Sequence, residues 1–300
     1  MLDAVAVGEA MAVLSPEVPV RLRHATTLSM SMAGAEVNVA VHLAALGLRS
    51  AFHSRVGDDP FGQLIADRLA DAGVEADLDI DERAPTGVYF KDPGIDGTSV
   101  HYYRTGSAAS MMDSSAWATC PPARLVHLSG ITPALSPSCA ALVSDGLGRR
   151  PVAGAIMSFD VNYRPRLWDP ATAAPILAAL ANQADIVFVG LDEAAVLWGT
   201  AGASEVRQVI HRPGALIVKD GPVGATAFDA ADVTFEPSTP IEIVEPVGAG
   251  DAFAAGYLYG LLTDQPTAKR LRLGHQLACA ALRTTADVGA LPAQLRTEPR

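Results

Sequence analysis

Short apolar runs alternate along this chain with segments in which apolar residues recur every three to four positions. The runs are rich in valine, isoleucine and leucine without polar alternation, which is typical of strands buried on both faces. They lie at 4–8, 51–56, 124–128, 155–159, 186–189, 216–218 and 241–244. Helical spacing is found at 36–46, 61–72, 136–147, 171–181, 192–198, 251–262 and 269–284. This order predicts an α/β fold with a mainly parallel central sheet, which binds ligands at the carboxyl ends of its strands.

Two stretches, 13–32 and 86–104, interrupt the alternation and look extended. Within the second stretch, 88–90 and 100–103 are predicted strands joined by a turn rich in glycine and aspartate. We expect the two excursions to form a small antiparallel sheet that covers the strand ends as a lid. No repeat or long linker divides the chain, so residues 1–300 are expected to form a single α/β domain with this lid.

Composition narrows the classes of partner. The 300 residues include 22 basic and 33 acidic side chains, so the formal net charge is −11, and 49% of the residues are hydrophobic. A chain this long and apolar can bury a large core. The negative charge argues against a general nucleic-acid binder, which normally carries a basic stripe. An anionic small molecule is still compatible with it, because a few well-placed arginines dominate the field of a local site.

Cysteine usage and the N-terminal sequence suggest a compartment. Cys120, Cys139 and Cys279 are far apart and have no zinc-binding spacing, so a reducing environment fits them. The first residues lack a basic segment that would begin a signal peptide. No apolar run reaches the ~18 residues of a membrane helix. We therefore expect a cytoplasmic protein with no membrane or nucleic-acid partner.

The richest candidate chemistry lies in residues 241–259, where a predicted strand runs into Gly248-Ala249-Gly250-Asp251 and a helix begins. Glycines there expose backbone N–H groups, and the helix N-terminus favours an anion such as a phosphate. Asp251 has two interpretations on this pattern alone. It is an ordinary N-cap, or it is a base that takes a proton from an attacking hydroxyl beside an anion-binding turn.

Residues 245–251 resemble D-T-x-G-A-G-D, the C-terminal signature of the ribokinase-like (PfkB) family of carbohydrate kinases. The resemblance implies a ribokinase-like three-layer fold with a small β-sheet lid. It also implies that Asp251 is the catalytic base and that Gly248, Ala249 and Gly250 form the anion hole. Residues 33–38 resemble the family's G-G-A-x-x-N segment, which implies that Gly34 and Asn38 contact the sugar.

The nucleotide side is implied by later segments of the chain. Residues 219–224 resemble the family's K-x-G-x-x-G loop, which implies that Lys219, Gly221 and Gly224 border the ATP, together with Gly248 and Gly250. Asn162 and Arg164 follow the predicted strand 155–159 and are expected at the same edge.

The resemblance also implies contacts with metal ions. Glu193 holds the acidic position of the N-x-x-E motif, so the resemblance implies that it contacts Mg²⁺ through water. It equally suits the first turn of a helix. A monovalent cation such as K⁺ near 287–290 is implied by the resemblance alone.

Three features bear on the substrate. Residues 160–168, D-x-N-x-R followed by P-x-L-W, resemble the 2-keto-3-deoxygluconate kinase and fructokinase branches of the family. Tyr103 and Arg104, followed by S-A-A-S, resemble the first branch in particular, and Tyr89 holds a typical sugar-stacking position there. The alternative for Tyr89 and Tyr103 is packing between strands. Arg104 and Arg164 supply positive charge suited to a carboxylate.

The sequence thus predicts an ATP-dependent kinase that phosphorylates a primary hydroxyl of a small sugar acid, with 2-keto-3-deoxygluconate converted to its 6-phosphate as the leading hypothesis. A fructokinase or other neutral-sugar kinase of the same family is the alternative, and a non-catalytic sugar or nucleotide sensor is a second. A nucleoside kinase lacks positive support. Assembly of a homo-oligomer through the edges of the lid is left open.

Overall fold

The chain is described by a computed structural model over residues 1–94, 97–229, 232–241, 244, 247–284 and 295. Its centre is a nine-stranded sheet in the order β13-β12-β11-β10-β9-β8-β1-β4-β5. Seven of the strands are parallel: β1 (Leu2–Val7), β4 (Ser50–Gly57), β5 (Glu75–Asp81), β8 (Ala123–Ser129), β9 (Ile156–Asp160), β10 (Ile186–Gly190) and β11 (Ala215–Asp220). At one edge, β12 (Gly224–Asp229) and β13 (Asp232–Pro237) are antiparallel. The predicted mainly parallel α/β fold is confirmed.

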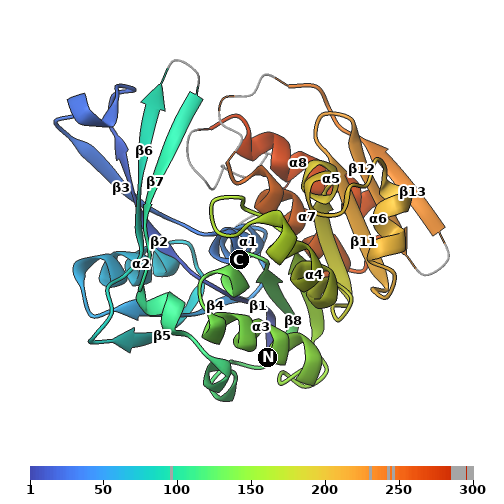
Figure 1. Cartoon of the computed structure of the whole chain (residues 1–300), viewed down its shortest axis with the longest axis horizontal. Coiled ribbons are helices and arrows are strands. Elements are labelled where there is room, and N and C mark those ends of the chain that lie inside the picture. The colour runs from blue at the N-terminus through green and yellow to red at the C-terminus, as the bar shows by residue number, and fades with distance from the viewer. Residues whose placement is uncertain (95–96, 230–231, 242–243, 245–246, 285–294, 296–300) are drawn as a thin grey trace.

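Helices cover both faces of this sheet (Figure 1). One face packs against α3 (Pro137–Arg149), α4 (Pro170–Ala181), α5 (Leu191–Trp198) and α6 (Ala203–Val209). The other packs against α1 (Ala35–Ala45), α2 (Pro60–Asp71), α7 (Ala249–Leu262) and α8 (Thr267–Ala281). Single 3₁₀ turns lie at 22–24, 108–111, 114–118 and 132–134. The result is three layers, and none of the described helices is long and apolar enough to cross a membrane.

A separate four-stranded sheet, here called the lid sheet, has the order β3-β2-β6-β7. Its strands are β2 (Met11–Pro16), β3 (Leu28–Ala33), β6 (Val88–Gly94) and β7 (Gly97–Tyr103). The expected purely antiparallel arrangement is wrong, because the central pair β2 and β6 is parallel. Both excursions leave the body after parallel strands, β1 and β5. Their outgoing strands therefore run in the same direction side by side, and the returning strands form the edges.

Several elements were not predicted. The strands β5, β12 and β13 and the helix α6 have no counterpart in the apolar pattern. The strand β5 alternates acidic and apolar residues at an edge of the sheet, so it lacks the continuous apolar run of a central strand. The strand predicted at 241–244 is not present at Ile241 or Val244, and residues 242–243 lie outside the described part.

Candidate active site

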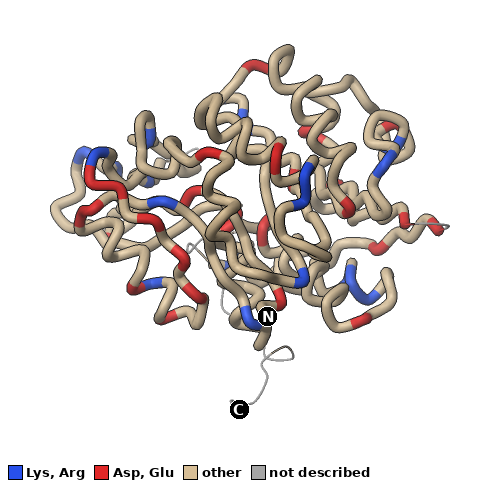
Figure 2. Tube along the Cα trace, turned by 90° about the horizontal axis from the view of Figure 1, so that it is seen from below, with Lys and Arg blue, Asp and Glu red and all other residues tan. Residues whose placement is uncertain are grey.

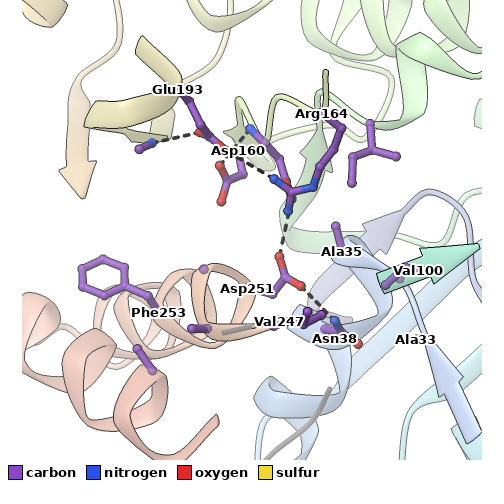
Figure 3. A pocket seen from close by; sticks show the side chains of 18 of the residues that line it. Ala33, Ala35, Asn38, Val100, Asp160, Arg164, Glu193, Val247, Asp251 and Phe253 are labelled. Atoms are coloured by element: carbon purple, nitrogen blue, oxygen red, sulfur yellow. Dashed lines mark hydrogen bonds and ion pairs between the residues drawn. The ribbon is translucent and has the colours of Figure 1, made fainter. Parts of the chain in front are cut away.

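A cleft of about 1610 Å³ lies between the lid sheet and the carboxyl ends of the parallel strands. The starts of α1 and α7 line it, as do the segments that follow β9, β10 and β11 and one face of the lid sheet. Candidate residues from six distant parts of the chain thus share one space. Figure 3 shows Asp251 within it, with Asn38 on one side and Asp160, Arg164 and Glu193 across the cavity.

The start of α7 combines an open anion site with a carboxylate. Gly248 is the N-cap in a left-handed conformation, with φ of 81°, and it has no side chain to cap the helix. The first N–H groups of α7 are therefore left to a ligand such as a phosphate. Asp251 lies in this first turn, and its Oδ2 accepts a hydrogen bond from Nδ2 of Asn38 at 2.8 Å.

Asp251 is poised for proton transfer near neutral pH. Burial raises the pKa of its carboxyl to about 7, and the nearby Asp160 carboxylate adds to this rise. The hydrogen bond from Asn38 and the positive charges of Arg164 and Lys219 oppose it. A general base is most useful when its pKa lies near the working pH. The geometry therefore favours the second interpretation of Asp251, a base at an anion-binding turn.

The start of α1 faces the same cleft. Gly34 is its N-cap, and a β-carbon at that position would lie 2.1 Å from the carbonyl oxygen of Glu9. Only glycine allows this approach, so Gly34 has a packing reason that is independent of any ligand. Asn38 is buried in the following turn, and its amide is satisfied by Asp251 on α7. The contact with the neighbouring helix explains the presence of a buried amide on α1.

Lys219 brings positive charge to the turn that begins α7. Its Nζ donates to Oδ2 of Asp160 at 2.9 Å, and a β-carbon at Gly250 would lie 3.5 Å from that Nζ. Burial alone would lower the pKa of Lys219, but the Asp160 and Glu193 carboxylates outweigh it and raise that pKa. The lysine is therefore charged beside the start of α7. Gly221 and Gly224, in the turn after it, also line the cleft and have positive φ angles.

Asn162, Arg164 and Glu193 lie across the cavity from α7. Asn162 is a buried residue with φ of 40°, and its Nδ2 is 3.5 Å from Oδ1 of Asp251. Nη1 of Arg164 is 3.6 Å from Oε1 of Glu193. The other oxygen of Glu193 accepts from the backbone N of Gly190 at 2.9 Å. Burial raises the pKa of Glu193, and Lys219 opposes that rise.

The lid sheet separates the two candidate tyrosines, Tyr89 and Tyr103. In the pairing of β6 with β7, Tyr89 is opposite Tyr102 and Val88 is opposite Tyr103. The rings of Tyr89 and Tyr102 contact each other at a centroid distance of 5.4 Å. Tyr103 packs edge-on against Phe90 instead and is 68% exposed. Strand alternation therefore places Tyr102 rather than Tyr103 beside Tyr89, although Tyr103 also lines the cleft.

Arg104 has a buried counter-ion that the sequence did not predict. Its guanidinium forms an ion pair with the carboxylate of Glu9, which also accepts a hydrogen bond from Ser107. Burial raises the pKa of Glu9, and the charge of Arg104 opposes that rise. The guanidinium also lies 5.8 Å from the ring centre of Tyr102. Arg104 is therefore not a free positive charge, although its buried Nε has no hydrogen-bond partner among the described residues.

Three residues of this site were absent from the predicted set: Asp160, Glu9 and Tyr102. Asp160 carried a signal, because it ends a buried strand and begins D-x-N-x-R. Glu9 carried a weaker one, as a carboxylate placed directly after the first apolar strand. The segment 287–290, predicted to lie near a monovalent cation, is outside the described residues.

Comparisons with known proteins agree with this geometry. A model of the pfkB family carbohydrate kinases matches residues 1–294. The 2-dehydro-3-deoxygluconokinase of Bacillus subtilis (strain 168) is 33% identical over 97% of this chain and 93% of that protein. The enzyme of the same name from Thermoproteus tenax is 31% identical over 99% of this chain and 94% of its own length. The crystal structure of a PfkB protein from Polaromonas sp. JS666 superposes with a TM-score of 0.86, at 31% identity, covering 94% of this chain and 96% of that one.

The fold and the site thus define a phosphotransferase that acts on the hydroxyl group of a sugar. The chain belongs to the pfkB family of carbohydrate kinases. The predicted family and enzyme class are both confirmed.

Proposed function

We propose that this kinase transfers the γ-phosphoryl group of MgATP to the primary hydroxyl of a sugar acid, and that 2-keto-3-deoxygluconate is converted to its 6-phosphate. The observation that carries the proposal is Asp251, a carboxyl with a pKa of about 7 in the first turn of a helix that no side chain caps. The substrate is supported by the names of the two relatives, since 2-dehydro-3-deoxygluconate is the same compound.

In this mechanism Asp251 accepts the proton of the attacking hydroxyl as its oxygen bonds to the γ-phosphorus, and the bond from that phosphorus to the bridging oxygen breaks, so that ADP leaves. The backbone N–H groups of residues 249–251 stabilise the charge that spreads over the phosphoryl oxygens. Lys219 adds a positive charge beside Gly250. Proton removal and charge stabilisation are thus supplied from one helix turn and one neighbouring strand end.

The nucleotide side is built from residues that already line the cleft. We assign Lys219, Gly221 and Gly224 to one wall of the ATP site, Asn162 and Arg164 to another, and Gly248 and Gly250 to the phosphates. When bound with ATP, Mg²⁺ supplies positive charge to the phosphates. Mg²⁺ keeps several waters and needs only one or two carboxylates, so the lone acid Glu193 fits a contact through water. No cluster of three or more metal-ligating side chains exists among the described residues.

The sugar side lies under the lid sheet. Gly34, Asn38, Tyr89 and Arg104 line this part, with Asp251 at its inner end. Because Glu9 neutralises Arg104, we assign Arg104 to uncharged sugar oxygens rather than to the substrate carboxylate. Arg164 is half exposed in the cleft and only loosely paired with Glu193, so we assign it to the substrate carboxylate. Apolar and aromatic lid residues above the sugar exclude water, which suppresses ATP hydrolysis.

An ADP-release assay with MgATP tests the proposal on purified protein, with 2-keto-3-deoxygluconate, fructose, ribose and gluconate as acceptors. Selective turnover of the ketodeoxy acid is expected. Selective turnover of fructose would overturn the substrate and favour the neutral-sugar alternative. Binding of ATP without turnover of any sugar would favour a sensor.

The two arginines refine the substrate assignment. Arg164→Ala is expected to raise KM for the ketodeoxy acid far more than KM for any neutral sugar that is turned over. Arg104→Ala is expected to impair all acceptors alike. An equal effect of Arg164→Ala on acidic and neutral acceptors would contradict the role of Arg164.

A further inference from the structure

Asp160 is a buried carboxylate that accepts hydrogen bonds from two parts of the active site. It ends β9, and only 2% of its surface is exposed. Oδ2 accepts the hydrogen bond from Nζ of Lys219, and Oδ1 accepts one from the backbone N of Asn162 at 3.2 Å. A buried acid costs free energy unless it is paired, and here both oxygens have partners.

The first contact connects Asp160 to the phosphate-binding turn. The side chain of Lys219 is 18% exposed and would be free to adopt several rotamers without a partner. The hydrogen bond to Asp160 restricts its ammonium to the side of the cleft where Gly250 begins α7. The positive charge is therefore placed before any nucleotide binds.

The second contact connects Asp160 to the base. Asn162 lies in the left-handed region, which is sparsely populated for residues other than glycine and requires local support. The hydrogen bond from its backbone N to Asp160 closes this turn and directs its amide toward Asp251. Asp160 also acts on Asp251 through its negative charge, which favours the protonated form of the base.

We infer that Asp160 is a positioning residue that sets the location of the Lys219 charge and holds both the Asn162 amide and its own negative charge near Asp251. This inference rests on the proposed function, because it assigns a role within the same phosphoryl transfer. Asp160 itself is turned toward Lys219 and Asn162, so it acts through them. Within the described part of the chain, the charged and polar groups that face Asp251 are Asn38 from α1, Lys219 from β11, and Asp160, Asn162 and Arg164 from the end of β9 and the loop after it.

Asp160→Asn is the direct test. It retains the size of the side chain and removes the charge, so kcat is expected to fall by about 100-fold through loss of positioning. The acid limb of the kcat/KM profile is expected to move below pH 7 by on the order of one pH unit, because a neighbouring negative charge is lost. A structural role alone would lower thermal stability and leave the limb at its wild-type pH.

Asp185→Asn is the matched control. Asp185 forms a similar bridge, to Arg150 at 2.8 Å, and also accepts from a backbone N of β9. It directly precedes β10, so it lies at the amino-terminal ends of the parallel strands, opposite the active site. Its loss is expected to reduce stability and leave both kcat and the pH profile unchanged.

A double-mutant cycle keeps the inference falsifiable if Asp160→Asn folds poorly. Removing both partners leaves no unpaired buried charge, so the Asp160→Asn, Lys219→Gln double variant is expected to be more stable than Asp160→Asn alone. In the Lys219→Gln background, Asp160→Asn is expected to cost less than about tenfold further in kcat. Fully additive losses would contradict the inference.

A readout without sugar separates this inference from the proposed function. The pKa of Asp251 is raised in the folded protein, so stability is lost as pH rises toward about 7. The gain in Tm from Asp251→Asn should therefore grow with pH and level off near pH 7. In the Asp160→Asn background it should level off at a lower pH. An unchanged plateau overturns the inference, whereas wild-type protein that turns over no sugar overturns only the proposed function.

Discussion

The starts of α1 and α7 are built alike and behave differently. Each helix begins at a glycine N-cap, Gly34 or Gly248, that has no side chain. Each is buried nearly all round and carries an acid in its first turn, Glu36 or Asp251. From the local pattern alone, either acid could be the base. What distinguishes them is the set of groups that the rest of the fold brings to each carboxyl.

The carboxylate of Glu36 accepts hydrogen bonds from two hydroxyl groups. Its Oε1 accepts from Oγ of Ser129 and from Oγ1 of Thr132, both at 2.7 Å. Asp251 accepts from amides instead, one at 2.8 Å and a weaker one at 3.5 Å. Both acids line the cleft, but Glu36 is only 1% exposed whereas Asp251 is partly exposed. Burial raises the pKa of both acids. The comparison shows that a structural acid and a candidate base can share a local motif and differ in their long-range partners.

The largest expected effect is at Asp251. Asp251→Asn removes the base and leaves its shape, so kcat for phosphoryl transfer should fall by about 10³-fold with the fold intact. Steady-state ADP release and circular dichroism are the measurements. A variant that keeps kcat within tenfold of wild type would show that Asp251, like Glu36, is not the base.

The glycines at the two helix starts should respond in opposite ways. At Gly250 a methyl group would meet Lys219 at ordinary contact distance, so Gly250→Ala should fold normally. We expect its kcat to fall by roughly 100-fold, because the methyl group crowds the phosphate-binding turn. At Gly34 a methyl group would collide with the Glu9 carbonyl, so Gly34→Ala should lose about 1–3 kcal/mol of stability or more.

Thermal melts and kcat, measured on both glycine variants, separate these effects. If Gly34→Ala has the same Tm as wild type, the backbone at position 34 does not approach the Glu9 carbonyl as closely as described. If Gly250→Ala turns over normally, the start of α7 does not bind the transferred phosphoryl group.

Glu36 should matter for stability more than for turnover. Glu36→Ala leaves the hydroxyl groups of Ser129 and Thr132 without their acceptor, which costs about 1–3 kcal/mol in the free energy of unfolding. Chemical denaturation measures this loss. The folded fraction should retain kcat within a few-fold of wild type. A loss of kcat comparable to that of Asp251→Asn would contradict the assignment of Glu36 as a structural acid.

The smallest expected effect is a shift in pH dependence. The hydrogen bond from Asn38 lowers the pKa of Asp251, so Asn38→Ala should raise that pKa and move the acid limb of kcat/KM to higher pH. We expect activity to recover as the assay pH is raised above 8. A limb that stays in place or moves to lower pH would contradict the assigned contact.

The sequence predicted the parts of this site that depend on local pattern. The turn 248–251 opens a helix, and Asn38 lies on a buried helix beside it, as the apolar spacing indicated. The edge strand β5 was missed because it alternates acidic and apolar residues. The contact of Tyr102 with Tyr89 was not predicted, because it depends on strand parity, which the pairing of β7 with β6 decides. The neutralisation of Arg104 by Glu9 joins residues 95 positions apart, and no local signal reports such a pair.

The most direct test of the account is the pH dependence of wild-type kcat/KM for the preferred sugar, because this profile reports the pKa of the free enzyme's base. The account predicts activity that falls about tenfold per pH unit below pH 7, the signature of one carboxyl that must lose its proton. A profile that stays flat from pH 8 to pH 5 would contradict Asp251 as the base.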